Sequence, residues 1–201
     1  MELLTLLLRA AAHFRSQVRV AFMTTLCAAL APGMAAAADP ESLEYAVKAA
    51  YLSKFGLFVE WPATAYASPG SALNVCVVGD DPFGAMLDTA AGGQRIDAHP
   101  IAVRRLKTVG RDSGCHILYI GSSEAQRTAQ IIAAVRGSGV LTVTDAQGSG
   151  ATGIVNFVIK DNRVRFDIDE EAAAQNGFAI SSKLLSLASN VKRRPLKETA
   201  K

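Results

Sequence analysis

Apolar positions along the chain change their spacing several times, and each spacing predicts a different element. Residues 40–59 carry apolar side chains at helical spacing, and Pro62 ends this predicted helix because the residue before a proline avoids the α region. We expect the helix to bury one face, which consists of Leu43, Ala46, Val47, Ala50, Tyr51, Phe55 and Phe58.

The middle of the chain alternates strand-like and helix-like segments. The expected strands are 73–78, 101–106, 116–120 and 140–144, with a short pairing segment at 94–96. A short helix is expected after the first strand. A longer helix is expected over 124–136, with Ser122 or Ser123 as its N-cap and Gly137 at its end. Strands that alternate with helices indicate a mostly parallel sheet.

The last third of the chain is expected to contain a β-hairpin. Two strand-like segments, 154–160 and 163–168, flank Asp161 and Asn162, which suit a two-residue hairpin loop. That loop sets a register in which one face of the hairpin is apolar. The apolar pairs are Ile159 with Val164, Phe157 with Phe166, and Val155 with Ile168.

Two helices are expected after the hairpin. Asp169 is placed to cap a helix over 170–176, and Ser181 or Ser182 is placed to begin a final helix. The apolar side of the final helix consists of Leu184, Leu185, Leu187, Ala188 and Val191. The predicted fold class is therefore α/β: a Rossmann-like or flavodoxin-like three-layer domain with a mostly parallel sheet and a C-terminal β-hairpin plus helices.

Residues 1–38 have the features of a cleaved secretory signal peptide. Arg15 and Arg19 precede an apolar run, and small residues up to Ala38 offer a cleavage site. The run has about 12 residues, whereas a spanning helix needs about 20, so an uncleaved membrane anchor is the less favoured alternative. Cleavage near Ala38 delivers the chain to the periplasm. The expected organisation is a signal peptide over 1–38, an α/β domain over 39–191 and a basic tail over 192–201.

Charge is nearly balanced once the leader is removed. The full sequence has 21 basic and 18 acidic residues, and the leader contains Arg9, Arg15, Arg19 and Glu2. A near-neutral domain lacks the broad positive surface that nucleic acid requires, so we expect no nucleic-acid partner. The basic residues of the tail are expected to be solvated, and a weak contact with anionic lipid is the alternative.

Export also leaves two cysteines, Cys76 and Cys115, each in an apolar, strand-like run. An even number of cysteines in an oxidising compartment predicts a disulfide, which would join two strands that are distant in sequence. A pair of buried free thiols is the alternative, because cysteine is among the most buried residues even without a bridge.

No set of residues after the leader predicts a catalytic or metal site. The segment Gly79–Gly84 follows a strand and precedes a helix, but it lacks the lysine of a phosphate loop and the spacing of a dinucleotide loop. His99 and His116 have no partner at metal-ligand spacing. Ser122 and Ser123 do not lie in a nucleophile-elbow motif. We therefore expect no enzyme activity, no cofactor and no metal.

Aromatic residues at the end of the first helix indicate a possible binding surface. Trp61, the only tryptophan, follows the helix beside the charged Glu60 and precedes a proline. A partly exposed tryptophan near a charged rim is a common anchor in protein interfaces. Core packing is the alternative, and the helical register favours it for Phe55 and Phe58.

Segments along nearly the whole mature chain resemble, in order, those of the YfiR family. They are Lys48–Pro62, Leu73–Gly84, Cys115–Ser123, Val140–Asp145, Ile154–Val158, Arg163–Ile168 and Ser181–Ala188. The resemblance implies a regulatory protein without catalytic activity. The chain departs from the best-known member in one place. That member carries a second, later cysteine pair, and this chain has none between Thr144 and Thr152, so the resemblance does not extend to redox control through that loop.

The best-known member of the family is a periplasmic dimer that restrains an inner-membrane diguanylate cyclase by binding the periplasmic sensor domain of that enzyme, and family members differ in their partners. An outer-membrane lipoprotein relieves the restraint, and the output is cyclic di-GMP, hence biofilm formation and motility. The resemblance thus implies a repressor whose partner-binding residues are expected to include Phe58, Trp61, Ser181, Ser182 and Lys183.

A periplasmic small-molecule binding module is the alternative function. In open α/β sheets, ligands bind at the carboxyl ends of strands where the strand order reverses, and the expected sheet has such a switch point. A hydrolase is a third hypothesis, and it lacks a nucleophile, base and orienting residue that can be named together.

Overall fold

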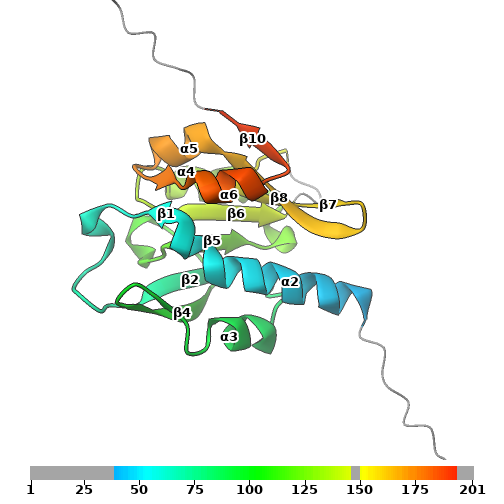
Figure 1. Cartoon of the computed structure of the whole chain (residues 1–201), viewed down its shortest axis with the longest axis horizontal. Helices are drawn as coiled ribbons and strands as arrows, with labels where there is room; N and C mark the ends of the chain where they lie inside the picture. Colours follow the sequence, from blue (N-terminus) through cyan, green and yellow to red (C-terminus); the bar gives the residue numbers. More distant parts are fainter. Residues whose placement is uncertain (1–38, 146–149, 194–201) are drawn as a thin grey trace, which may run out of the picture. The chain divides into compact units, whose positions relative to one another are not determined.

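In the computed structural model of the chain, residues 39–145 and 150–193 are described, and the expected signal peptide over 1–38 and residues 194–201 of the expected tail lie outside them. Within the described residues, eight strands form one sheet in the order β10-β8-β7-β6-β5-β2-β4-β3 (Figure 1). Neighbouring strands are parallel except in the pairs β7–β8 and β3–β4. The predicted α/β class with a mostly parallel sheet is confirmed.

The strands of this sheet are close to those that the sequence predicts. Their bounds are β2 Leu73–Val78, β3 Arg95–Ile96, β4 His99–Leu106, β5 Ile117–Ile120, β6 Leu141–Asp145, β7 Val155–Lys160, β8 Arg163–Asp169 and β10 Asn190–Lys192. Nearly every residue of β2, β5 and β6 is buried. Burial on both faces explains why these three strands are almost continuously apolar.

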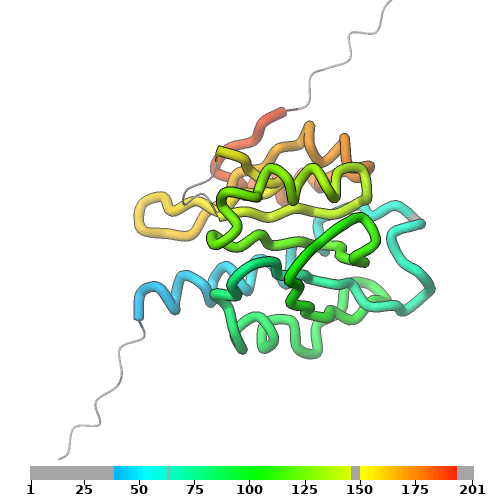
Figure 2. Tube along the Cα trace, turned by 180° about the vertical axis from the view of Figure 1, so that it is seen from behind, coloured from blue at the N-terminus to red at the C-terminus, as the bar shows by residue number. Residues whose placement is uncertain are grey.

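Helices cover both faces of the sheet, as Figures 1 and 2 show from opposite sides. On one face lie α2 (Pro40–Phe55), α3 (Ala85–Ala91) and α6 (Ser182–Leu187), and on the other lies α4 (Thr128–Ala134). The short helix α5 (Glu170–Gln175) follows β8, and Asp169 caps it as expected by accepting a hydrogen bond from the Ala172 N–H. Short 3-10 turns are η1 (Gly56–Phe58), η2 (Ala63–Ala65), η3 (Arg111–Ser113) and η4 (Ser122–Glu124).

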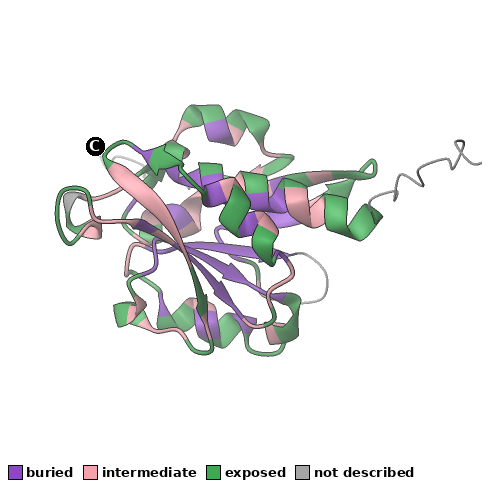
Figure 3. Cartoon of the chain, turned by 90° about the horizontal axis from the view of Figure 1, so that it is seen from below, coloured by how far each residue is buried: buried purple, intermediate pink, exposed green. Residues whose placement is uncertain are grey.

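Successive side chains along a strand point to opposite faces of the sheet, and this divides the core into two parts. Val75, Val77 and Tyr119 contribute to the larger part, under α2 and α3, whereas Val78 and Ile120 contribute to the smaller part, under α4. Figure 3 shows the buried residues concentrated in the strands between the two layers of helices. Among the helices of the described segments, none combines the length and the apolar character needed to cross a bilayer.

The hairpin has the register that the sequence predicts. Ile159 pairs with Val164, and the pairing continues to Val155 with Ile168. Asp161 and Asn162 have φ values of 50° and 54°, as both central residues of a type I′ turn require. Ile159 near the tip is 45% exposed, so the apolar face of the hairpin extends beyond the core.

The buried face of α2 differs from the prediction. Leu43 and Val47 are 61% and 37% exposed, whereas Leu52, Phe55 and also Lys48 are buried. The prediction was wrong because Lys48 turns inward to pair with Asp145 of β6, and this rotation leaves Leu43 and Val47 outside. An apolar stripe of α2 is therefore left facing outward.

Two further helix predictions were wrong at their ends. Ser122 and Ser123 do not cap a helix over 124–136: they lie in η4, α4 begins only at Thr128, and the Ser123 hydroxyl accepts a hydrogen bond from the backbone of Asp80 instead. The final helix ends at Leu187. Val191 lies in β10, paired with β8, because the chain returns to the sheet edge after α6. Lys192, where the expected tail begins, is also part of β10.

Cys76 and Cys115 form the predicted disulfide, and their Cα atoms lie 5.8 Å apart. Cys76 is on β2 and Cys115 lies just before β5, so the bridge joins neighbouring parallel strands at the centre of the sheet. Both side chains are buried in the part of the core under α4.

We expect loss of this disulfide to destabilise the protein. The bridge closes a loop of 39 residues, and the chain-entropy model assigns such a loop about 4 kcal/mol of stability. Urea unfolding of the oxidised and the reduced protein measures the difference. Peptide mass spectrometry should find Cys76 and Cys115 alkylated only when reductant is added before the alkylating reagent. Alkylation of both cysteines in the native, untreated protein contradicts the bridge.

Candidate functional site

A two-stranded ladder brings two distant segments of the chain together. β1 (Val59–Glu60), which follows η1, pairs antiparallel with β9 (Ala179–Ile180), which precedes α6. The backbone N–H of Ser181 donates a 2.9 Å hydrogen bond to the carbonyl of Phe58 and so extends the ladder. The residues predicted for partner binding come from these two segments, and the fold places the segments side by side.

Exposed side chains from both segments form one surface beside this ladder. The Lys183 ammonium lies 5.9 Å from the centroid of the Phe58 ring, within the range of a cation–π contact. Leu57 is 54% exposed, and Leu187, one helical turn after Lys183, is 56% exposed. We call this the α6 surface, defined by Leu57, Phe58, Ser182, Lys183 and Leu187. Exposed apolar side chains next to a cation are a common composition for a protein interface.

Ser181 and Trp61 support this surface from behind. The Ser181 hydroxyl accepts a 3.4 Å hydrogen bond from the Leu184 N–H at the start of α6. Trp61 is half-buried, and its indole N–H donates to the carbonyl of Gly56 at 3.1 Å. Its ring packs against Phe178 with 5.6 Å between centroids. Both residues therefore fix the position of the segments that carry the exposed side chains.

A stack of rings continues from Trp61 into the loop that leads to β2. The Tyr66 ring lies between His99, 3.5 Å away by centroids, and His116, 4.8 Å away. The Trp61 ring meets His116 edge-on at 5.7 Å. The candidate surface is thus connected by packed rings to His116, which lies directly before β5.

His116 is held as a neutral ring. Its Nδ1 accepts a hydrogen bond from the Asn74 backbone N–H at 3.1 Å, so its proton is on Nε2, which donates to the carbonyl of Ala65 at 3.0 Å. Burial lowers the pKa of His116 below its usual value, and this effect outweighs the hydrogen bond to Ala65. The neutral histidine joins the loop around η2 to the sheet.

At the switch point of the sheet, the two loops approach each other closely. The chain passes from β2 to β4 on one side and later places β5 on the other, so the switch point lies between β2 and β5. The Gly121 N–H donates to the Val78 carbonyl at 2.9 Å. A Cβ atom on Gly121 would lie 2.8 Å from the Asp80 carbonyl oxygen. The loops after the two strands are therefore in direct contact at Gly121 and Asp80.

The glycine-rich loop after β2 is held by an arginine. Arg105 on β4 forms 2.7 Å ion pairs with Asp81 in this loop and with Asp88 on α3, and it also donates to the Gly84 carbonyl. The acidic residues that follow β2 are thus partners of Arg105. Their arrangement fixes α3 against β4 and repels rather than cradles a phosphate.

A buried ion pair under α2 is the main feature that sequence reasoning missed. Lys48 is fully buried, and its ammonium lies 2.5 Å from carboxylate oxygens of Asp145 at the end of β6 and Glu44 on α2. The Tyr119 hydroxyl donates to the same Asp145 oxygen at 3.4 Å. The one available signal was the spacing of Lys48 with Leu52 along the helix, which places both residues on the interior face.

The charges in this cluster compensate one another. Burial by itself lowers the pKa of Lys48, but hydrogen bonds to Asp145 and Glu44 outweigh it and raise the pKa. Burial and the neighbouring Asp145 charge raise the pKa of Tyr119. Lys48 is therefore held as a cation and Tyr119 as a neutral phenol, so the cluster anchors α2. Within residues 39–145 and 150–193, no group of three or more histidine, cysteine, aspartate or glutamate side chains is arranged to hold a metal ion.

Comparison with known proteins gives one match. The sequence profile of the YfiR/HmsC-like family matches residues 45–189, which include both segments of the α6 surface, the disulfide and the Lys48–Asp145 pair. No curated protein matches the chain at a significant level.

We expect Lys48→Met to destabilise the protein severely. The change leaves Asp145 buried without a cation, and breaking a buried pair in this way costs about 3–5 kcal/mol. Urea unfolding measures the loss, and adding Asp145→Asn should restore part of it because the uncompensated charge is removed. Lys54→Met, on the exposed side of the same helix, is the matched control and should unfold nearly as the native protein does. Equal effects of the two lysine substitutions would argue against the anchoring role.

Acid should destabilise the fold through His116. Because burial lowers its pKa in the folded state below the ordinary value of 6.5, the unfolded chain takes up the proton first. The contribution of the neutral His116 to the free energy of unfolding is therefore fully present above about pH 6.5, and it decreases as the pH falls below that value. His116→Asn keeps an acceptor for the Asn74 N–H but cannot be protonated. Thermal unfolding between about pH 7.5 and 5 should show a weaker dependence on pH in the variant, and an unchanged slope would contradict the assignment.

Proposed function

The chain belongs to the YfiR/HmsC-like family, and on this basis we propose that it is a periplasmic regulatory protein that represses an inner-membrane diguanylate cyclase. It binds the periplasmic sensor domain of that enzyme and so lowers cyclic di-GMP, with consequences for biofilm formation and motility. The family match over residues 45–189 carries this proposal. In this proposal the signal peptide is cleaved near Ala38, the protein acts as a homodimer, and an outer-membrane lipoprotein relieves the repression.

The α6 surface supports a role in protein binding. It combines two exposed leucines, Leu57 and Leu187, with the Phe58 ring and the Lys183 ammonium. Interfaces of this kind are dominated by a few apolar and aromatic anchors within a polar rim, and here Ser182 and Lys183 supply the rim. Ser181 and Trp61 complete the proposed partner-binding set by holding the two segments in register.

The disulfide supports export. Cys76 and Cys115 are bridged at the centre of the sheet, and such bridges persist in oxidising compartments such as the periplasm. Binding without catalysis is supported by the state of the buried ionisable groups. Lys48 and Asp145 are paired with each other, and His116 is neutral with both ring nitrogens hydrogen-bonded.

We expect deletion of the gene to raise cyclic di-GMP several-fold in a strain that encodes a neighbouring membrane cyclase, because the enzyme is no longer restrained. Nucleotide extraction and mass spectrometry measure the change, and expression of the native chain should reverse it. The variant Lys183→Glu/Leu187→Glu should fail to reverse it, since it places two acidic groups on the α6 surface.

The matched control is Lys107→Glu/Ala133→Glu, which also places two acidic groups at exposed positions, one just after β4 and one on α4. This control should restore repression fully. Unchanged cyclic di-GMP on deletion would contradict the proposed function. Full repression by the α6-surface variant, present at normal levels in the periplasm, would contradict the proposed surface while leaving the function intact.

A further inference from the structure

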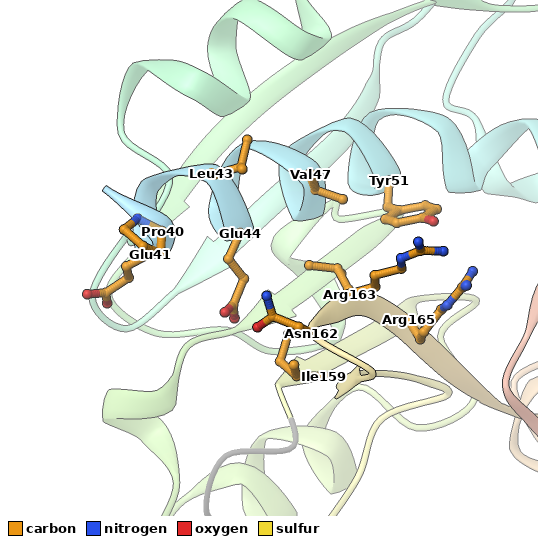
Figure 4. Close-up of a pocket in the computed structure, with 11 residues that line it drawn as sticks. Pro40, Glu41, Leu43, Glu44, Val47, Tyr51, Ile159, Asn162, Arg163 and Arg165 are labelled. Atoms are coloured by element: carbon orange, nitrogen blue, oxygen red, sulfur yellow. The ribbon is translucent and has the colours of Figure 1, made fainter. Parts of the chain in front are cut away.

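A groove of about 580 Å³ opens between the N-terminal half of α2 and the β7–β8 hairpin (Figure 4). Leu43, Val47 and Tyr51 line it from the helix, and Ile159 and Val164 line it from the hairpin. Leu43, Val47 and Ile159 are exposed large apolar side chains, and they face one hollow instead of being scattered. A concave apolar surface of this size is typical of a binding site.

One wall of the groove is the edge of a strand. Residues 162–165 all line the groove. Successive side chains of a strand point to opposite faces of the sheet, so consecutive residues can line one groove only if the groove borders the edge of the strand. On this side of β8, β10 pairs only with Asp167–Asp169, and the Ser189 N–H bonds to the Phe166 carbonyl. In the described part of the chain, no strand covers this edge at Val164.

The backbone of Val164 is turned toward this open edge. In a hairpin with a two-residue loop, the pair next to the loop, here Lys160 and Arg163, exchanges both hydrogen bonds. The next pair, Ile159 and Val164, therefore directs its N–H and C=O groups away from the partner strand. The backbone N–H of Val164 can thus donate a hydrogen bond to an additional strand, and its C=O can accept one from that strand.

Positive charge lines the same edge. Arg163 and Arg165 are exposed, and neither forms an ion pair with any residue in the described ranges. Lys160 lies directly opposite Arg163, an arrangement of like charges that costs stability. On the facing wall, Glu44 is already paired with the buried Lys48, so Glu41 alone opposes the arginines. The open edge is therefore cationic.

We propose that this groove binds an extended, acidic segment of a partner protein, which adds to β8 as a further strand. Its backbone bonds to the N–H and C=O of Val164, its acidic side chains pair with Arg163 and Arg165, and its apolar side chains enter the hollow beside Leu43 and Val47. Strand addition of this kind takes affinity from main-chain hydrogen bonds and specificity from the pockets for alternate side chains.

A second copy of this chain fits the edge poorly. If two β8 edges paired antiparallel about Val164, Arg163 of each copy would lie opposite Arg165 of the other, and like charges directly opposite each other are destabilising. Cationic side chains on a strand edge prevent self-association of this kind while admitting an acidic strand. The groove is a separate surface from the α6 surface, and the inference does not depend on the proposed control of cyclic di-GMP.

Photo-crosslinking in the cells that encode the protein tests this inference. The full chain carries Leu43→p-benzoylphenylalanine, and the cross-linked peptide is sequenced by mass spectrometry. We expect a segment of another protein in which apolar and acidic residues alternate. Val164→Pro removes the outward N–H, and Arg163→Glu/Arg165→Glu reverses the charge of the edge, so each should lower the adduct yield about tenfold. Val164→Thr, which keeps the N–H, and Lys107→Glu/Arg136→Glu, which reverses exposed charges elsewhere, should leave the yield unchanged.

Three results would overturn the proposal: an adduct with a second copy of the chain, an adduct that both β8 variants leave unchanged, or a yield no higher than that of Ala133→p-benzoylphenylalanine on α4. If Val164→Pro fails to fold, as judged by circular dichroism, the Arg163→Glu/Arg165→Glu variant becomes the deciding test. Both arginines are exposed and form no ion pair in the described ranges, so this variant should fold. The readout does not involve cyclic di-GMP, so failure here is distinguishable from failure of the proposed function.

Discussion

Lys48 on α2 reaches Asp145 at the end of β6, and this buried ion pair decides which face of the helix meets the sheet. The buried Asp145 carboxylate needs a cation, and the helix supplies it by turning Lys48 inward, together with Leu52 and Phe55. Leu43 and Val47 are then left on the outside, where they form one wall of the groove. The same anchoring fixes the far end of α2, from which η1 and β1 lead to the α6 surface.

The centre of the sheet is built for rigidity. The Cys76–Cys115 bridge joins β2 and β5, and the loops after these strands touch at Gly121 and Asp80. This is the switch point, where many α/β proteins bind a ligand. The features suited to binding lie at the periphery, at both ends of α2, which is the arrangement expected of a protein that meets other proteins.

The two surfaces differ in chemistry and therefore in the partners they fit. The α6 surface presents leucines, an aromatic ring and a lysine from η1 and α6. The groove presents an apolar hollow, an open strand edge and two arginines. A regulatory protein with separate surfaces can bind one partner while another is released or recruited, because occupation of one does not require the residues of the other.

The sequence by itself determined the features that depend on neighbours along the chain or on a residue count. Asp161 and Asn162 adopt positive φ readily, so the hairpin register followed from them. Continuous apolar runs identified the buried strands, two cysteines predicted one bridge, and a series of segments placed the chain in its family. Only the tertiary structure decided the orientation of α2, the return of Val191 to the sheet, and the meeting of Phe58 with Ser181. These three features depend on contacts between residues far apart in sequence, such as Lys48 with Asp145. The periodicity of one segment holds no information about the charge or backbone group that a distant segment will bring to it.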